Sequence, residues 1–371
     1  MSSSSTRLPA EPVLDWRALK RSGNDDWPSI FDLEQGRYLA SEAAALSAAL
    51  DLIDAGPGTP LLIPSIPGPG LLNLLRAREV TALFYRLGGD FSPDLDHAQR
   101  LMRFKPRAIL AGHPFGLAVP LAATASFARE QGLRFIEDCT EALWGFARTI
   151  TRDEEGGLTD TRLAMGTQGE LCIAAPARHL PGWSAGILAS AHREQALPEP
   201  PATPLTSDLG MTAGALKDVL GRVLDPHRPA RDAEATLCAD IKPAPRGTRT
   251  WYQMLDHVHC IEQRRAHYHR LSLEVSGTGV FTPIVPDLPE GAVPTLYPVD
   301  SPERDRVHAI LQDSGIPATN LRDRIPDELQ HGVCERADTL RTHGLGLPCH
   351  QSLRPGQMDR QVAQLLRFQL P

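Results

Sequence analysis

Lysine is scarce in this chain. Only four of the 371 residues are lysine, at positions 20, 105, 217 and 242, although lysine and arginine together number 38. A reaction that needs a side-chain amine, such as Schiff-base formation with a carbonyl compound, therefore has few candidate residues.

Several other signals are absent. None of the six cysteines forms a CxxC pair, so neither a zinc site nor a disulfide framework is indicated. No apolar run approaches the roughly 20 residues of a membrane-spanning helix, and the first residues lack the apolar stretch of a secretory signal. The net charge of -7 gives no electrostatic footprint for nucleic acid or an anionic membrane. We expect a cytoplasmic protein whose partner is a small molecule or a protein, with neither nucleic acid nor a membrane involved.

Thirteen histidines raise the question of a metal site. The cluster at His257 and His259 falls on a predicted helix, but the residues four positions further on are Ile261 and Gln263, which cannot complete a pair of ligands. We expect these histidines to lie on a solvated helix face and expect no metal.

Short apolar segments alternate with amphipathic ones along the first 140 residues. This alternation predicts an α/β fold with a mostly parallel sheet between helices, and function at the carboxyl ends of the strands. The predicted strands are 59–65, 81–87, 107–113 and 133–139, and the predicted helices are 41–56, 70–78, 94–103 and 120–132, the first capped by Ser41 and ended by Gly56.

The rest of the chain divides at a break near Pro243. We expect a leader over residues 1–30, a large domain over 31–242 and a small C-terminal α+β domain over 243–371. A loop or hairpin at 151–168 interrupts the large domain. The small domain should hold a long helix at 251–275, a strand at 293–299, a capped helix ending at Gly315 and a last helix at 356–368.

Several stretches resemble the DegT/StrS family of sugar aminotransferases, which are pyridoxal-phosphate enzymes of fold type I. They are IEDCTEAL (136–143), AILAGHPFG (108–116), FYRLGGDFSPDLD (84–96) and LGLPCHQSL (345–353). The resemblance implies a homodimer with a small-molecule substrate. It also implies that Asp138 would meet the pyridine nitrogen of the cofactor.

The stretch GELCIAAPARHLPGWSAGIL (169–188) is similar to the family segment that carries the Schiff-base lysine. In that alignment Arg178 takes the lysine position. Arginine cannot replace the amine, because its delocalised guanidinium stays protonated and is neither an imine former nor a general base. We therefore expect no standard transaminase cycle, and none of the four lysines is expected near the active edge.

Other contacts that the resemblance assigns to the cofactor phosphate have changed in the same direction. The family serine falls on Ala175, the glycine-bearing turn becomes Ala40-Ser41-Glu42-Ala43, and a partner asparagine falls near Asp208. Carboxylates facing a phosphate dianion weaken its binding. Pyridoxal phosphate or pyridoxamine phosphate is the alternative to no cofactor, and Asp138, Ser41 and Glu42 would then contact it.

Four functional readings stay open. The first is a repurposed or degenerate homologue in which Arg178 clamps an anion while His179, His113, Asp138 and Glu141 transfer protons. In its structural version, Arg178 pairs with Asp138 or Glu141, and His113 is a packed strand-end residue. The second is a dehydratase-like enzyme that holds pyridoxamine phosphate and uses His179. The third is an ordinary aminotransferase. The fourth is a non-catalytic partner of an active paralogue, in sugar or natural-product biosynthesis.

Overall fold

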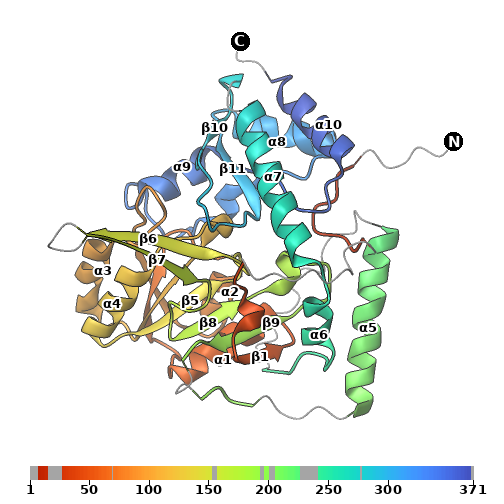
Figure 1. Cartoon of the computed structure of the whole chain (residues 1–371). Coiled ribbons are helices and arrows are strands. Elements are labelled where there is room, and N and C mark those ends of the chain that lie inside the picture. Colours follow the sequence, from red (N-terminus) through yellow and green to blue (C-terminus); the bar gives the residue numbers. More distant parts are fainter. Residues whose placement is uncertain are drawn as a thin grey trace.

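A computed structural model of the whole chain shows two lobes (Figure 1). It describes residues 7–15, 27–68, 70–152, 157–192, 196–199, 205–225, 241–275 and 278–368. No helix within these ranges is both long and apolar enough to cross a membrane.

A seven-stranded sheet with the order β1-β9-β8-β5-β4-β2-β3 forms the centre of the large lobe. Neighbours from β8 to β3 are parallel, whereas β9 pairs antiparallel with β8 and with β1. The mostly parallel sheet is thereby confirmed. Its strands are β1 (Gln35–Leu39), β2 (Pro60–Pro64), β3 (Thr81–Tyr85), β4 (Ala108–Gly112), β5 (Arg134–Cys139), β8 (Leu171–Ala174) and β9 (Gly186–Ser190).

Both faces of this sheet are buried, which explains why its strands are apolar runs. Alternate residues of one strand belong to different cores: Ile136 of β5 packs with α1 and α2, and Phe135 packs with α3 and α4. The helices are α1 (Glu42–Leu52), α2 (Leu71–Ala77), α3 (Leu95–Leu101) and α4 (Ala122–Gln131), with short 3₁₀ turns at Ile30–Asp32, Met102–Phe104, Pro114–Gly116 and Pro176–Arg178.

Helix α1 begins where the sequence predicts and ends earlier. The Ser41 hydroxyl accepts the N–H of Ala44 at 3.1 Å, which satisfies an otherwise unpaired donor of the first turn. The helix ends at Leu52, because Asp54 adopts a left-handed conformation (φ 52°), so the predicted end at Gly56 is wrong.

The C-terminal lobe is built on a four-stranded antiparallel sheet of order β10-β11-β13-β12. Its strands are β10 (Thr282–Pro283), β11 (Leu296–Asp300), β12 (Thr319–Asn320) and β13 (Gly344–Pro348). The 3₁₀ turn Leu321–Arg324 follows β12, and the lobe's helices include α8 (Arg304–Asp313), α9 (Glu335–His343) and α10 (Pro355–Leu365). The predicted α+β character is therefore present in these residues.

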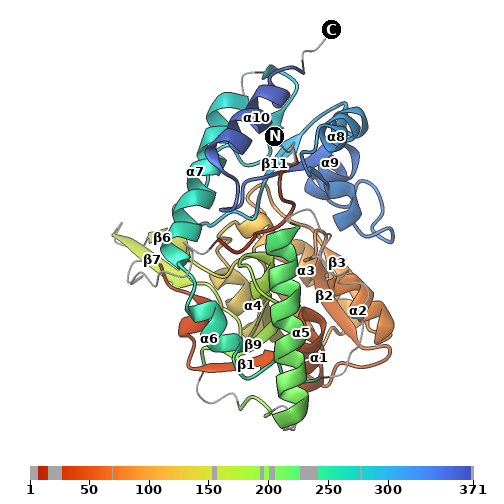
Figure 2. The same cartoon turned by 90° about the vertical axis from the view of Figure 1, so that its right-hand side faces the viewer.

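The long helix predicted over 251–275 is two helices, α6 (Thr248–Gln253) and α7 (His257–Val275). The chain turns at Asp256, whose carboxylate accepts the N–H of His259 at 3.0 Å and so begins α7. The excursion predicted at 151–168 overlaps a hairpin that begins earlier, formed by β6 (Phe146–Arg152) and β7 (Leu158–Ala164). Helix α5 (Leu205–Leu224) stands on the right-hand side of the molecule in Figure 1 and faces the viewer in Figure 2.

Residues 7–15, part of the segment suggested as a leader, pack against both lobes. Leu8 is buried in the core of the small lobe and Leu14 in that of the large lobe. The Leu8 N–H donates to the Gly315 carbonyl at 2.8 Å, and the buried His350 ring donates to the Pro9 carbonyl at 3.0 Å. We call residues 7–15 the strap, because they join the two lobes.

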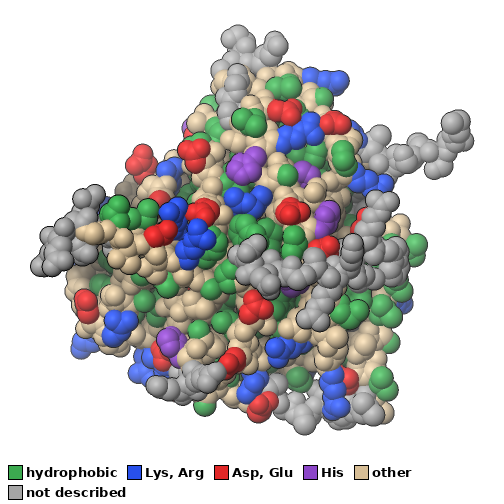
Figure 3. Space-filling view, viewed as in Figure 1, with side chains coloured by type: hydrophobic (Ala, Val, Ile, Leu, Met, Phe, Trp, Pro, Cys, Tyr) green, Lys and Arg blue, Asp and Glu red, His purple; other side chains and the backbone are tan. Residues whose placement is uncertain are grey.

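Acidic and basic side chains are interspersed on the face shown in Figure 3. The red and blue groups alternate across both lobes there, so this face carries no patch of a single sign. An interspersed surface does not steer polyanions toward the protein.

Candidate functional site

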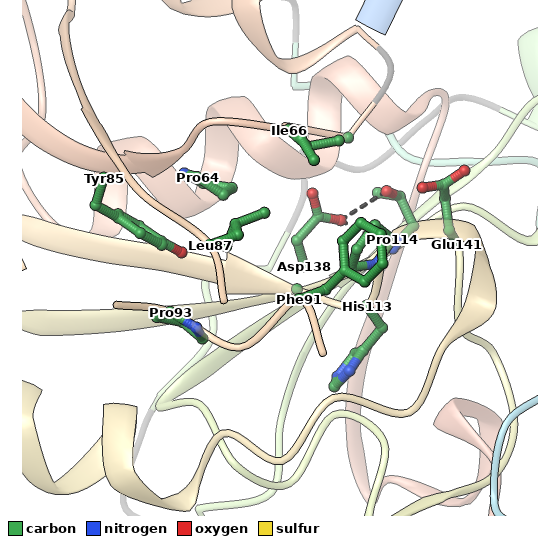
Figure 4. Close-up of a pocket in the computed structure, with 13 residues that line it drawn as sticks. Pro64, Ile66, Tyr85, Leu87, Phe91, Pro93, His113, Pro114, Asp138 and Glu141 are labelled. Atoms are coloured by element: carbon green, nitrogen blue, oxygen red, sulfur yellow. Dashed lines mark hydrogen bonds between the residues drawn. The ribbon is translucent and has the colours of Figure 1, made fainter. Parts of the chain in front are cut away.

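A hollow lies at the carboxyl ends of β2, β4 and β5, where the parallel sheet predicts a site. It has about 380 Å³ of empty space including open solvent, of which about 20 Å³, room for about one water molecule, is accessible to water within the pocket. We call it the central pocket. Its lining, part of which Figure 4 labels, is Pro64, Ile66, Gly68, Tyr85, Leu87, Phe91, Pro93, Gly112, His113, Pro114, Asp138, Thr140 and Glu141.

Asp138, at the end of β5, is the carboxylate at the floor of this pocket. Its Oδ1 accepts both the hydroxyl of Thr140 at 2.6 Å and the Thr140 N–H at 2.9 Å. Figure 4 shows the other oxygen turned toward Ile66. Burial raises the pKa of Asp138, and the Thr140 hydrogen bonds offset this only in part.

Arg178 lies on the 3₁₀ turn after β8 and forms an ion pair with Glu42. Its Nε donates to Glu42 Oε2 at 2.8 Å, and both side chains are mostly buried, at 29% and 23% exposure. Although burial disfavours the charged guanidinium, the Glu42 carboxylate holds the pKa of Arg178 above its ordinary value. Burial also raises the pKa of Glu42. The predicted pairing of Arg178 with Asp138 or Glu141 is wrong, because Glu42 takes that place.

Glu141 pairs instead with Arg324, which the small lobe contributes. Two guanidinium nitrogens donate to the two carboxylate oxygens at 3.0 and 2.5 Å, and both side chains are about nine-tenths buried. Arg324 also lies over the Phe115 ring, and the Phe115 N–H donates to Glu141 at 3.2 Å. This cluster closes one side of the central pocket.

His113 contacts Glu137, the residue before Asp138 in β5. The Val119 N–H donates to His113 Nδ1 at 3.1 Å, so the ring proton is on Nε2, which donates to Glu137 Oε1 at 3.1 Å. The ring is fully buried and is directed away from Asp138 (Figure 4). Its two nitrogens are both engaged, as for a packed strand-end residue, and its proton-transfer role stays a prediction.

His179 follows Arg178 but lies beneath the turn. Its Nε2 donates to the Thr140 carbonyl at 3.1 Å, and its ring meets the edge of Trp144. The side chain is fully buried. Burial, together with the charge of Arg264, lowers the pKa of His179 well below its usual value, so the ring is neutral.

Stability should fall in acid because buried histidines must be protonated when the chain unfolds. Burial lowers the pKa of His179, and it lowers that of His350 to about 3. Each buried neutral histidine adds its full stabilisation above about pH 6.5. As the pH falls from there toward the pKa of the folded state, that stabilisation decreases, by about 2 kcal/mol per histidine at pH 5. Urea unfolding at pH 7.5 and 5 measures it. The raised pKa values of Glu42 and Asp138 act in the opposite direction.

The matched variant is His350→Gln, which keeps a donor for the Pro9 carbonyl and cannot be protonated. Its unfolding free energy should fall less steeply in acid than that of the parent protein. An unchanged slope would show that His350 does not contribute.

Three further predicted positions have structural roles within this chain. Ser41 caps α1, Ala175 is buried before the 3₁₀ turn, and the buried Asp208 of α5 accepts the N–H of Arg246 at 3.0 Å. The side chains of Lys105, Lys217 and Lys242 are exposed, and Lys20 is outside the described residues. The backbone of Lys242 nevertheless lies closer to the start of α1 than expected, because its carbonyl accepts the N–H of Ala40 at 2.9 Å.

In the described part of the chain, one buried group has the composition of a metal site: His113, Glu137 and Cys139. The oxygens of Glu137 already accept the N–H groups of Gly166, Gln168 and Gly169 at 2.7, 2.7 and 2.8 Å. These contacts lower the pKa of Glu137 despite its burial, with His113 contributing most. The group is a structural network with its donors and acceptors in use.

Sequence reasoning missed the roles of Glu137 and Arg324. A charged residue inside the apolar strand 133–139 was the available signal for Glu137, since a buried charge requires partners. Arg324 gave no signal, because it is 183 residues from Glu141 in the chain.

Part of the chain is similar in sequence to a known enzyme family. Residues 38–150 match the model of the DegT/DnrJ/EryC1/StrS aminotransferase family. A curated relative, dTDP-4-dehydro-2,3,6-trideoxy-D-glucose 4-aminotransferase of Saccharopolyspora spinosa, is 32% identical over 108 residues, which are 29% of this chain and 28% of the relative. The match thus spans little more than a quarter of that relative's length.

Solved structures resemble the chain over most of its length. The aminotransferase TlmJ from Streptoalloteichus hindustanus has a TM-score of 0.63 at 20% identity, covering 90% of this chain and 85% of that one. PseC of Helicobacter pylori, an aminotransferase in pseudaminic acid biosynthesis, has a TM-score of 0.62 at 14% identity, covering 97% and 98%. The expected resemblance is confirmed: the chain is similar in sequence to the DegT/DnrJ/EryC1/StrS aminotransferase family over residues 38–150, and it shares the fold of these solved aminotransferases over nine-tenths of its length.

Proposed function

We propose that this protein is a homologue of the sugar aminotransferases that does not carry out transamination through a lysine Schiff base. The observation that carries the proposal is the ion pair between Arg178 and Glu42. It lies where the alignment places the cofactor-bearing amine and the start of the phosphate-binding helix. The two groups satisfy each other, and neither offers the chemistry that pyridoxal phosphate requires.

The residues around this ion pair do not fit the phosphate cofactor. The Ser41 hydroxyl is already used by the Ala44 N–H, and the next residue, Glu42, brings a carboxylate to the helix start, where an anion would have to bind. Ala175 has no hydroxyl to offer. Asp138 alone is compatible with a pyridine nitrogen, and one carboxylate does not make a cofactor site.

The internal contacts favour a catalytically silent homologue over a repurposed enzyme. Among the predicted proton-transfer groups, Glu141 is held by Arg324, His113 by Glu137 and His179 by the Thr140 carbonyl. The dehydratase-like alternative needs a histidine at the cofactor, and the buried ring of His179 supports it poorly.

The biological setting is proposed from the relatives. The name of the Saccharopolyspora relative supports a role in a pathway that makes amino sugars or natural products. We also propose a homodimer, a domain boundary near residue 242 and a role beside an active paralogue.

The test is cofactor capture. We expect the protein purified with pyridoxal phosphate to show no covalent adduct by mass spectrometry after borohydride reduction. Arg178→Lys alone should gain little, because Glu42 still repels the phosphate dianion. The triple variant Arg178→Lys, Glu42→Thr, Ala175→Ser should gain a stoichiometric adduct on the new lysine.

The matched control is the same triple variant with glutamine instead of lysine at position 178, which should retain no covalent adduct. A covalent adduct in the unaltered protein, on Lys242 or any other lysine, would overturn the proposal. A full adduct in the single Arg178→Lys variant would show that only the amine is missing.

A further inference from the structure

We propose that the central pocket binds the primary ammonium group of a small monocationic amine, with Asp138 as its anchor. The inference rests on the proposed function, because the phosphate cofactor would occupy the same space. It replaces an anionic ligand by a cationic one. Three features of the pocket support it: a carboxylate oxygen that accepts no hydrogen bond from a described residue, one carboxylate more than the arginines that pair with them, and an apolar part of the lining.

The free oxygen is Asp138 Oδ2. Asp138 is 6% exposed, and both of its hydrogen bonds go to Oδ1. No hydrogen-bond donor among the described residues reaches Oδ2, which faces the pocket (Figure 4). Oδ2 is not among the buried polar atoms that lack a partner, so it is accessible from the pocket. A ligand N⁺–H that reached it would make a charge-assisted hydrogen bond that no described donor supplies.

Asp138 forms no ion pair with a described residue, although the nearby charge of Arg178 lowers its pKa against the larger effect of burial. Glu42 is paired with Arg178, and Glu141 is paired with Arg324. Asp138 is the third carboxylate, and its neighbours Thr140 and Tyr85 are neutral. One positive charge on the ligand balances the site, whereas an anionic ligand would add to the excess.

The space beside Asp138 selects the shape of that cation. The whole pocket has about 20 Å³ of water-accessible space, room for about one water molecule, which suits an –NH₃⁺ group better than a trimethylammonium group. Leu87, Phe91 and Pro93 line the pocket with apolar surface, against which a flat or apolar ligand body can lie. The predicted ligand class is a primary amine on a small apolar or aromatic body.

Gly68 controls access to Asp138. A Cβ at this position would lie 2.5 Å from Asp138 Oδ2 and 3.1 Å from Thr140 Oγ1, well inside normal contact. Alanine at position 68 should therefore cover the oxygen that the ammonium group needs. Gly56 is the matched control, since a Cβ there meets no atom within 4 Å.

The experiment is calorimetric titration with benzylamine, benzyl alcohol and benzyltrimethylammonium at neutral pH. We expect benzylamine to bind at least tenfold more tightly than both of the other compounds. Asp138→Asn keeps the acceptor for Thr140 and removes the charge, so it should abolish the preference. Gly68→Ala should weaken benzylamine binding at least tenfold, and Gly56→Ala should leave it unchanged. Thermal unfolding of each variant confirms that it is folded.

Equal affinity for benzylamine and benzyl alcohol, or unchanged binding in folded Asp138→Asn, would overturn the inference. Equal binding of benzyltrimethylammonium would overturn the primary ammonium assignment. The cofactor test is run on the same preparation. If no lysine adduct forms and benzylamine still shows no preference, only this inference fails, whereas a lysine adduct with pyridoxal phosphate removes the proposed function itself.

Discussion

Replacing Glu137 by alanine is expected to lower the free energy of unfolding by at least about 4 kcal/mol, because several buried donors lose their acceptor together. The carboxylate accepts N–H groups from Gly166, Gln168 and Gly169 and the ring N–H of His113. Each buried donor left unsatisfied costs about 1–3 kcal/mol. No solvent reaches the site to replace the carboxylate, because Glu137 is fully buried.

Urea unfolding followed by circular dichroism measures this loss. Glu130→Ala is the matched control, an identical change at an exposed position of α4, and should alter stability by less than about 0.5 kcal/mol. The stability loss of Glu137→Gln should lie between those of Glu137→Ala and Glu130→Ala. The glutamine amide keeps one acceptor oxygen but turns a donor toward the backbone N–H groups. A loss in Glu137→Ala no larger than that of the control would refute the network.

Replacing Arg264 by alanine should cost about 3–5 kcal/mol of stability, because three acceptors around the buried guanidinium lose their donor at about 1–3 kcal/mol each. Arg264 of α7 is 1% exposed, and its guanidinium donates to Gln351 Oε1 at 2.8 Å, the Pro294 carbonyl at 2.9 Å and the His179 carbonyl at 3.0 Å. The side chain thus joins three segments, one of which is the turn that carries Arg178. These partners are neutral, and burial lowers the pKa of Arg264.

A second variant separates the loss of volume from the loss of hydrogen bonds. Arg264→Met fills much of the space and removes a buried charge, so it should be less destabilised than Arg264→Ala. Arg129→Ala, at an exposed position of α4, is the control. Hydrogen exchange of residues 176–181 should increase in Arg264→Ala relative to the control. Unchanged exchange there, with full stability, would show that Arg264 does not hold the turn.

The large lobe could be predicted from sequence because its strands are buried on both faces. Segments such as Pro60–Pro64 and Ala108–Gly112 are nearly continuous apolar runs, and helices with recognisable ends, such as that capped by Ser41, lie between them. The break between α6 and α7 was missed, because a single capping aspartate inside a polar segment, Asp256, is a weak local signal.

The site was only partly predictable. Arg178, Glu42 and Asp138 could be singled out because a resemblance aligned them with residues of known role. Which charges pair could not be predicted, since Glu42 and Arg178 are 136 residues apart and Arg324 comes from the other lobe. Ion pairing depends on the packed tertiary structure, which local patterns in the sequence do not encode.

The strap has a consequence for how the chain reaches its native state during synthesis. Residues 7–15 leave the ribosome well before His350, which follows Pro9 by 341 residues and donates to its carbonyl. Contacts this distant in sequence form late, because the intervening chain must first be ordered. The buried site of Leu8, which is lined by residues as far along the chain as Leu365, therefore stays open until those residues are made. Docking of Leu8 should therefore follow the synthesis of residues 344–365, and a nascent chain that stops before Gly344 should expose the apolar core around Leu8.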